Sequence, residues 1–238
     1  MHIKPLKNGY LLSTEFYNSK ATESWFSPEY WQAKNAIVNS KQGRTTAWFY
    51  AYDNTVFVLK HFMRGGLIGK ILSDQYLYTG LKNTRIFKEF NLLRELNEKG
   101  LPAPVPKAAQ IRVSGLIYRG DLITEAIKGA QSICEICQTR PLDDTEVSEI
   151  AQTLGKFHNA GVYHADLNIN NILLSDQGKA YLIDFDRGEF REPNTQWQQS
   201  NISRLKRSFD KEAQKWPQFH FSKANWDTIL TCYQEALL

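Results

Sequence analysis

The sequence has few of the features expected of a membrane-spanning or a disulfide-rich secreted protein. Its longest stretch without a charged residue is 193–203, which is mostly polar, whereas a spanning helix needs about 20 consecutive apolar residues. Residues 1–13 lack the apolar run of a secretory signal. Only three cysteines occur, an odd number that favours reduced thiols over a disulfide framework. We therefore expect the protein to remain on the cytosolic side of the membrane.

Two short motifs are incomplete. Cys134 and Cys137 form a C-x-x-C pair, which suggests a redox site or half of a zinc site. A structural zinc needs four ligands, and no second pair or nearby histidine follows, so two structural thiols on one helical turn are the favoured interpretation.

Residues 64–70 (RGGLIGK) resemble a phosphate-binding Walker A loop. That motif would need glycine in place of Arg64 and serine or threonine in place of Ile71.

The composition and residue patterns indicate an α+β protein. The 238 residues are 42% hydrophobic and 13% aromatic, with a net charge of +4, which suits one domain of two lobes or two small domains. Aromatic and β-branched runs dominate the first half of the chain, and amphipathic helices dominate the second. Residues 1–36 are interpreted as an irregular leader with one short helix at 28–36. The expected elements are hairpins at 45–60 and 109–127 and helices at 85–99 and 143–159.

Acidic and amide residues at fixed spacing carry the strongest functional signal. Asp166 is followed by Asn171 and then by Asp184, within the segments 163–174 (YHADLNINNILL) and 181–186 (YLIDFD). These offsets match the kinase catalytic loop H-x-D-L-x-x-x-N and its metal-binding D-F-x. Phosphoryl transfer from ATP requires Mg²⁺ held by hard oxygen ligands and an oriented acceptor hydroxyl. We assign Asp184 and Asn171 to the metal and Asp166 to the hydroxyl proton.

A kinase also needs a strand lysine for the α- and β-phosphates and a helix glutamate that pairs with it. Lys60 ends the apolar run 56–60, and Glu89 lies in the following predicted helix. Glu95 and Glu98 are alternative partners, but Glu89 is favoured because it lies earlier in the helix, on a face compatible with its apolar residues.

The remaining nucleotide contacts are predicted around two loops. The turn 42–46 would cover the phosphates through backbone amides and nearby side chains. Segment 124–127 (TEAI) fits the hinge, where backbone groups would bind the edge of adenine. The residues assigned to ATP binding in these loops are Gly43, Arg44, Thr45, Thr46, Glu125 and Ile127.

Beyond these motifs, the span 43–188 resembles the protein-kinase-like superfamily and, within it, the lipopolysaccharide kinases that act on 3-deoxy-D-manno-octulosonic acid (Kdo). The closer resemblance is carried by residues 64–70, 72–81, 100–106, 162–167 and 181–188. It implies a two-lobed kinase-like fold, with a strand-rich N-lobe at 1–127, a helical, shortened C-lobe at 128–238, and ATP bound where the lobes meet. It also implies Mg²⁺-dependent phosphorylation of a Kdo hydroxyl on a Kdo-lipid A precursor, at the cytoplasmic face of the inner membrane of a Gram-negative bacterium.

The sequence departs from regulated protein kinases at three positions. Ala165 replaces the arginine that receives an activation-loop phosphate, Asn168 replaces a lysine, and Asp186 replaces the glycine of D-F-G, with no A-P-E segment following. We therefore expect neither a protein substrate nor a nucleic-acid partner. The alternatives are a heptose or aminoglycoside-type kinase and, from another class, a pseudokinase that serves as a membrane-binding module.

Two basic regions are candidates for contact with a lipid substrate. Segment 204–215 holds five basic and two acidic residues and is either a solvated helix packed on the second lobe or a surface for anionic lipid. Arg64 and Lys70, together with Lys82 and Arg85, could instead bind phosphates of the acceptor. Either arrangement predicts a peripheral membrane protein.

Overall fold

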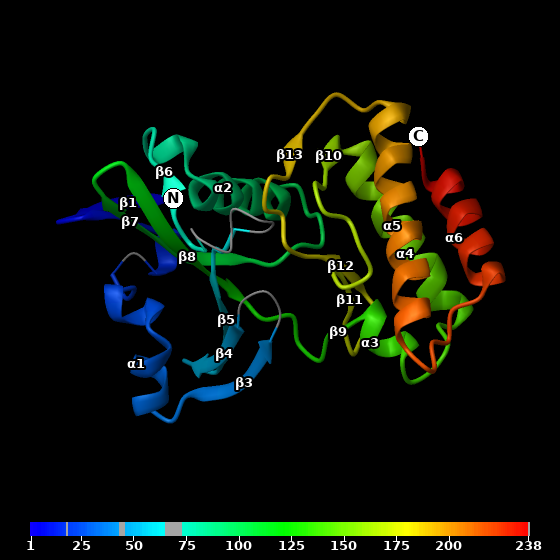
Figure 1. Cartoon of the computed structure of the whole chain (residues 1–238), viewed down its shortest axis with the longest axis horizontal. Coiled ribbons are helices and arrows are strands. Elements are labelled where there is room, and N and C mark those ends of the chain that lie inside the picture. Colours follow the sequence, from blue (N-terminus) through cyan, green and yellow to red (C-terminus); the bar gives the residue numbers. More distant parts are fainter. Residues whose placement is uncertain (18, 43–45, 65–72, 238) are drawn as a thin grey trace. The chain divides into compact units, whose positions relative to one another are not determined.

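A computed structural model describes the whole chain except residues 18, 43–45, 65–72 and 238 (Figure 1). The chain forms two compact units. The first comprises Met1–Arg94 and Val105–Ala126, and the second comprises Glu95–Pro104 and Ile127–Leu238. Helix α2 (Arg85–Glu98) begins in the first unit and ends in the second.

The first unit is built on an antiparallel sheet with the strand order β1-β2-β7-β8-β5-β4-β3, and β6 also pairs with β8. Short helices η1, η2 and α1 lie between β2 and β3, and η4 precedes α2. The bounds are β1 His2–Leu6, β2 Gly9–Ser13, η1 Glu15–Tyr17, η2 Glu23–Phe26, α1 Pro28–Ala33, β3 Ile37–Gln42, β4 Thr46–Tyr52, β5 Thr55–His61, β6 Tyr76–Leu77, η4 Leu81–Asn83, β7 Pro106–Ser114 and β8 Ile117–Glu125.

The two predicted hairpins and the helix between them are confirmed. Asp53 and Asn54 join β4 to β5 with φ angles of 51° and 57°, which are the left-handed conformations that a tight hairpin turn of the I′ type requires. Strands β7 and β8 form the second hairpin, and Ser114 lies opposite Ile117 next to its turn. Helix α2 ends at Glu98 and is soon followed by Gly100, whose φ of 70° is typical of a residue that follows a helix.

The interpretation of residues 1–36 as an irregular leader is wrong. Strands β1 and β2 form a hairpin, and β2 joins the sheet beside β7, with Leu12 opposite Ala109. Gly9 makes this approach possible, because a Cβ atom there would lie 1.9 Å from the carbonyl oxygen of Ile111. Helix α1 of this segment contributes to the core, because Trp31 is buried and stacks on the ring of Tyr50 at 4.0 Å.

The second unit is mainly helical, with short strand pairs that hold the loops. Helix α4, which was predicted, starts with a capping box in which Asp143 and Glu146 each accept a hydrogen bond from the other's backbone N–H. It packs against α6. The bounds are β9 Gln131–Ser132, α3 Ile133–Cys137, α4 Asp144–Asn159, β10 Val162–Tyr163, β11 Ile172–Leu174, β12 Ala180–Leu182, β13 Glu189–Phe190, α5 Thr195–Lys215 and α6 Lys223–Ala236.

Helix α5 packs its apolar side into the second unit. Leu205 and Phe209, which alternate with basic residues in the sequence, are fully buried, so they are not available to enter a lipid surface. Within the described residues, no helix is both long enough and apolar enough to cross a membrane. The sheet of the first unit and the helices of the second confirm the expected α+β class, and the fold is consistent with a kinase-like one.

Candidate functional site

The loop that carries Asp166 is held by its own side chains. The carbonyl oxygen of Asp166 accepts hydrogen bonds from the amide groups of Asn168 at 2.8 Å and Asn171 at 2.9 Å. The Asp166 carboxylate is exposed, with 57% of the side chain accessible to solvent. A rigid backbone therefore presents a solvent-accessible carboxylate, which is the arrangement that a general base needs.

Asn171 and Asp184 lie at the same end of neighbouring strands. Strands β11 and β12 pair Ile172 with Leu182, and the N–H of Ile183 donates to the carbonyl oxygen of Asn171 at 3.0 Å. Asp184 follows directly and has a φ of 61°, a rare conformation for a residue other than glycine and one that is often found at functional sites. The geometry therefore places the two predicted metal ligands at one strand end.

These residues fit Mg²⁺, which binds one or two carboxylates and completes its shell with phosphates and water. Because the side-chain nitrogen of Asn171 donates to the carbonyl oxygen of Asp166, its amide oxygen is the atom that could bind a metal. No group of three or more His, Cys, Asp or Glu residues suited to a metal is found in the part of the chain that the structure describes.

Phe185 and His164 anchor the loop that carries Asp184. Phe185 is fully buried and stacks on Phe157 at 5.7 Å between ring centroids. The N–H of Asp166 donates to Nδ1 of His164 at 3.2 Å, and Nε2 of His164 lies 2.9 Å from the carbonyl oxygen of Ile183. Because Nδ1 accepts, Nε2 carries the proton and donates.

Helix α5 contacts the catalytic loop at three points that the sequence analysis did not find. Asn201 exchanges hydrogen bonds with the backbone N–H and carbonyl of His164 at 3.3 and 3.1 Å. Arg204 donates from Nη1 to Oδ1 of Asp166 at 3.0 Å, and Oγ of Ser208 accepts from the N–H of Ile169 at 3.1 Å. The only available sequence signal was the basic character of segment 204–215.

In the first unit, the ion pair expected between Lys60 and Glu89 is present, with 3.2 Å from Nζ to Oε1. Glu89 is 3% exposed, and Lys60 also lies 4.9 Å from the ring centroid of Phe62. Strand β5 thus presents a lysine whose position is set by a buried carboxylate and an aromatic ring.

The structure covers part of the predicted nucleotide contacts. Thr46 begins β4 and pairs with Gln42 across the β3–β4 hairpin, whereas Gly43, Arg44 and Thr45 lie outside the described residues. The N–H of Glu125 donates to the carbonyl of Val105 at 2.9 Å, so the candidate adenine contact on Glu125 is its carbonyl oxygen. Ile127 is the first residue of the second unit's longer segment, and its carbonyl accepts from Ala130 at 3.3 Å.

Of the two predicted substrate residues, Lys70 lies outside the described residues. The side chain of Arg64 makes contacts within the first unit. Nε of Arg64 donates to the carbonyl of Gln75, and its guanidinium lies 4.9 Å from the ring centroid of Tyr76. Tyr76 also holds Arg85, at 3.2 Å from its hydroxyl to Nη1. These contacts favour a structural role for Arg64.

The C-x-x-C pair is placed as two buried thiols on α3. Burial raises the pKa of Cys137 to about 12, and burial together with the charge of Glu212 raises the pKa of Cys134. The reactive thiolate is therefore disfavoured at both positions, in agreement with a structural interpretation.

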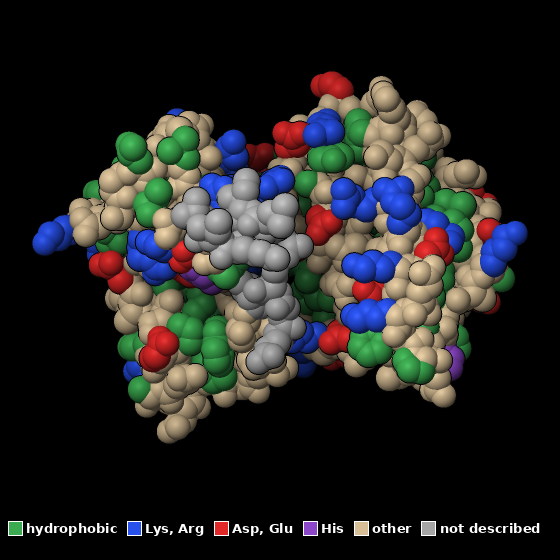
Figure 2. Space-filling view, in the orientation of Figure 1, with side chains coloured by type: hydrophobic (Ala, Val, Ile, Leu, Met, Phe, Trp, Pro, Cys, Tyr) green, Lys and Arg blue, Asp and Glu red, His purple; other side chains and the backbone are tan. Residues whose placement is uncertain are grey.

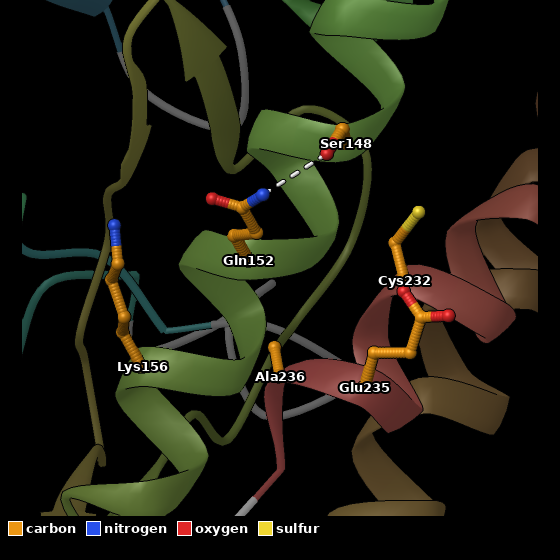
Figure 3. Close-up of a pocket in the computed structure, with 6 residues that line it drawn as sticks. All are labelled: Ser148, Gln152, Lys156, Cys232, Glu235 and Ala236. Carbon is orange, nitrogen blue, oxygen red and sulfur yellow. Dashed lines mark hydrogen bonds between the residues drawn. The ribbon is translucent and has the colours of Figure 1, made fainter.

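A hollow of about 350 Å³ lies between α4 and α6 (Figure 3). Its lining residues are Ser148, Gln152 and Lys156 of α4 and Cys232, Glu235 and Ala236 of α6. None of the residues assigned to ATP, metal or substrate is among them.

Comparison with known proteins confirms the family resemblance found in the sequence. The sequence pattern of the lipopolysaccharide kinase (Kdo/WaaP) family matches residues 28–233. A 3-deoxy-D-manno-octulosonic acid kinase of Vibrio parahaemolyticus is 42% identical over 204 residues, which cover 86% of this chain and 85% of the relative. Kinases of the same name from Vibrio cholerae and Haemophilus influenzae are 41% and 38% identical, covering 79% and 91% of this chain and 80% and 92% of theirs.

Proposed function

The chain belongs to the lipopolysaccharide kinase (Kdo/WaaP) family, and we propose that it transfers the terminal phosphate of ATP to a hydroxyl of Kdo carried by a lipid A precursor. The observation that carries this proposal is the joining of Asp166, Asn171 and Asp184 through one loop and one strand pair. The names of relatives that match most of the chain support Kdo as the acceptor.

Each residue has a distinct role in this reaction. Asp166 accepts the proton of the attacking hydroxyl, which its exposed carboxylate can reach. Asp184 and Asn171 hold Mg²⁺, which when bound neutralises charge on the phosphates. Lys60, oriented by Glu89, binds the α- and β-phosphates.

The other contacts complete the proposal. Gly43, Arg44, Thr45 and Thr46 cover the phosphates, and the backbone of Glu125 and Ile127 binds adenine. Arg64 and Lys70 remain candidates for an anionic group of the acceptor, although the contacts of Arg64 weaken its case. We also propose that an N-terminal lobe, 1–127, and a C-terminal lobe, 128–238, form one catalytic domain; the compact units differ from these lobes mainly in that residues 95–104 belong to the second unit.

We further propose that the protein attaches to the anionic cytoplasmic face of the inner membrane. The basic side chains of α5 are on its surface, while Leu205 and Phe209 are buried. Attachment therefore rests on charge, at about 1 kcal/mol for each basic residue close to anionic lipid.

The test of this function is phosphate transfer to lipid A precursor with and without Kdo, read by mass spectrometry, with Asp166→Ala as the inactive control. One added phosphate on the Kdo-bearing lipid alone is expected. Equal transfer to both lipids would contradict Kdo as the acceptor and favour a heptose or aminoglycoside-type kinase. Absence of transfer together with absence of Mg²⁺-dependent ATP binding would favour a pseudokinase.

A further inference from the structure

Four basic residues of α5 lie along one face of the helix. Arg204, Arg207, Lys211 and Lys215 are spaced by three, four and four residues, the spacing that places side chains on one face of an α-helix. All four are exposed. We call this set the basic stripe. Figure 2 shows Lys and Arg side chains gathered over α5.

The charge of the basic stripe is only partly neutralised. Arg204 pairs with Asp166 at 3.0 Å, and Lys215 lies 3.4 Å from a carboxylate oxygen of the buried Glu212. Among the described residues, no carboxylate pairs with Arg207 or Lys211. The middle of the stripe is therefore positive charge without a protein partner.

The lysine on the other flank of α5 is paired with a carboxylate. This residue, Lys206, pairs with Asp210 one turn later. The helix thus carries one lysine whose charge is balanced within the helix and another, Lys211, whose charge is not.

The stripe has a fixed position relative to Asp166. Asn201 and Ser208 bond the backbone of the catalytic loop on either side of Arg204, so α5 cannot slide along that loop without breaking these bonds. At a rise of 1.5 Å per residue, Arg207 and Lys211 lie about 4.5 and 10.5 Å further along the axis than Arg204. These offsets are on the scale of one or two sugar residues.

We propose that the basic stripe binds phosphate groups of the acceptor and so positions its sugar hydroxyl at Asp166. This inference rests on the proposed function and names how the same site recognises its substrate class, a phosphate-bearing glycolipid. An arginine fork and a lysine ammonium both suit phosphate oxygens. The acceptor is favoured over the membrane surface in general because the stripe begins at the catalytic carboxylate and not at a remote face.

The test compares acceptor kinetics of Arg207→Gln/Lys211→Gln with the wild type. Lys211→Gln and Lys206→Gln form a matched pair, because each removes one lysine charge from the same helix. The acceptor is the Kdo-bearing lipid A precursor in detergent, either intact or with its phosphates removed by a phosphatase. ATP KM and acceptor KM are measured separately, and binding to phosphatidylglycerol vesicles is measured without acceptor.

We expect the double variant to raise the acceptor KM for the intact lipid about 10-fold or more, since each lost contact is a charge-assisted one. ATP KM should stay within about twofold of the wild-type value. Lys206→Gln should have little effect, and Lys211→Gln an intermediate one. Removing the lipid phosphates should impair the wild type by a similar factor and leave the double variant nearly unchanged.

Two results would overturn the inference. One is an equal loss by the double variant on intact and dephosphorylated acceptor. The other is an unchanged acceptor KM combined with lost vesicle binding, which would assign the stripe to the membrane. Failure of the proposed function is distinguishable, because it would appear as full activity of Asp166→Ala or equal transfer to lipid lacking Kdo, whatever the stripe variants do.

Discussion

His164 joins the loop of Asp166 to the loop of Asp184 through the carbonyl of Ile183, which lies 2.9 Å from its Nε2. The other ring nitrogen accepts the backbone N–H of Asp166. One imidazole therefore sets the spacing between the proposed base and the residue that precedes Asp184, the proposed metal ligand. To separate the proposed roles of Asp166 and Asp184, each of these residues must be replaced while His164 is left in place.

Asp166→Ala and Asp184→Ala should have different effects. Asp166→Ala should lower kcat by about 10²- to 10⁴-fold with nucleotide binding retained, because only the proton acceptor is lost. Asp184→Ala should also lose Mg²⁺-dependent nucleotide binding. Steady-state kinetics and calorimetric titration with an ATP analogue, with and without Mg²⁺, check this. Full activity of both variants would reject the assignment.

Arg204 should act as a positioning residue for Asp166. Its guanidinium holds Oδ1 of the carboxylate at 3.0 Å, so Arg204→Ala should release that orientation and lower kcat about 10-fold, while ATP KM changes little. Arg204→Lys retains the charge and should recover part of the activity. A parallel loss of thermal stability and ATP binding, without rescue by lysine, would instead indicate a structural contact.

The Lys60–Glu89 pair predicts a separation between stability and activity. Lys60→Met leaves the buried carboxylate without this partner and should lower the free energy of unfolding by about 1–3 kcal/mol, as well as weakening ATP use. The double variant Lys60→Met/Glu89→Gln should recover stability but not activity. Urea unfolding and kinetics of both variants test this, and recovery of activity in the double variant would exclude Lys60 from ATP binding.

Membrane attachment should be sensitive to salt. Raising ionic strength from about 0.1 to 1 M shortens the Debye length from about 10 to 3 Å and should release the protein from anionic vesicles without detergent. Neutral phosphatidylcholine vesicles are the control and should bind little at either salt concentration. Retention at 1 M salt would require an apolar contact that α5, with Leu205 and Phe209 buried, does not offer.

Acid should destabilise the second unit through His158. This side chain is 2% exposed, and its Nδ1 lies 2.6 Å from the hydroxyl of Tyr233. Burial lowers its pKa from 6.5 to about 4, so between these values the unfolded chain binds more protons than the folded one. Stability therefore falls as pH drops through that range, by about 3 kcal/mol in total.

The measurement is the urea midpoint between pH 7 and 4 for the wild type and His158→Asn, whose profile should be flatter. His61 provides a contrast of opposite sign. Its hydrogen bond to Asp121 raises its pKa, so its contribution is present below pH 6.5 and is lost as pH rises through the folded-state value. Identical profiles for wild type and His158→Asn would contradict the assignment to His158.

Elements with local signals were predictable from the sequence. The hairpin at Asp53 and Asn54 and the helix capped by Asp143 follow from turn and cap chemistry within a few residues. The β1–β2 hairpin was missed although its pairing is local, with Leu6 opposite Gly9 and the dipeptide Asn8-Gly9 at the turn. Only its place beside β7 depends on pairing across a long sequence separation, which leaves no local pattern.

The candidate site likewise contains residues with a local sequence signal and residues without one. Fixed offsets within a motif pointed to Asp166, Asn171 and Asp184 because rigid loops preserve such spacing. Arg204 follows Asp166 by 38 residues and belongs to a helix whose charges also suit a solvated surface. Only the packing of α5 against the catalytic loop distinguishes it from its basic neighbours.

Only residues 185–188 separate Asp184 from β13, and this segment is too short to act as an activation loop. β13 begins at Glu189 and pairs with β10, and the N–H groups of Gly188 and Arg191 donate to the carbonyls of Phe185 and Gly161, both at 2.7 Å. A segment tied down so soon cannot be ordered by a modification and released by its removal. We therefore do not expect activity to depend on the ordering and release of this segment, in contrast to the activation loop of a regulated protein kinase.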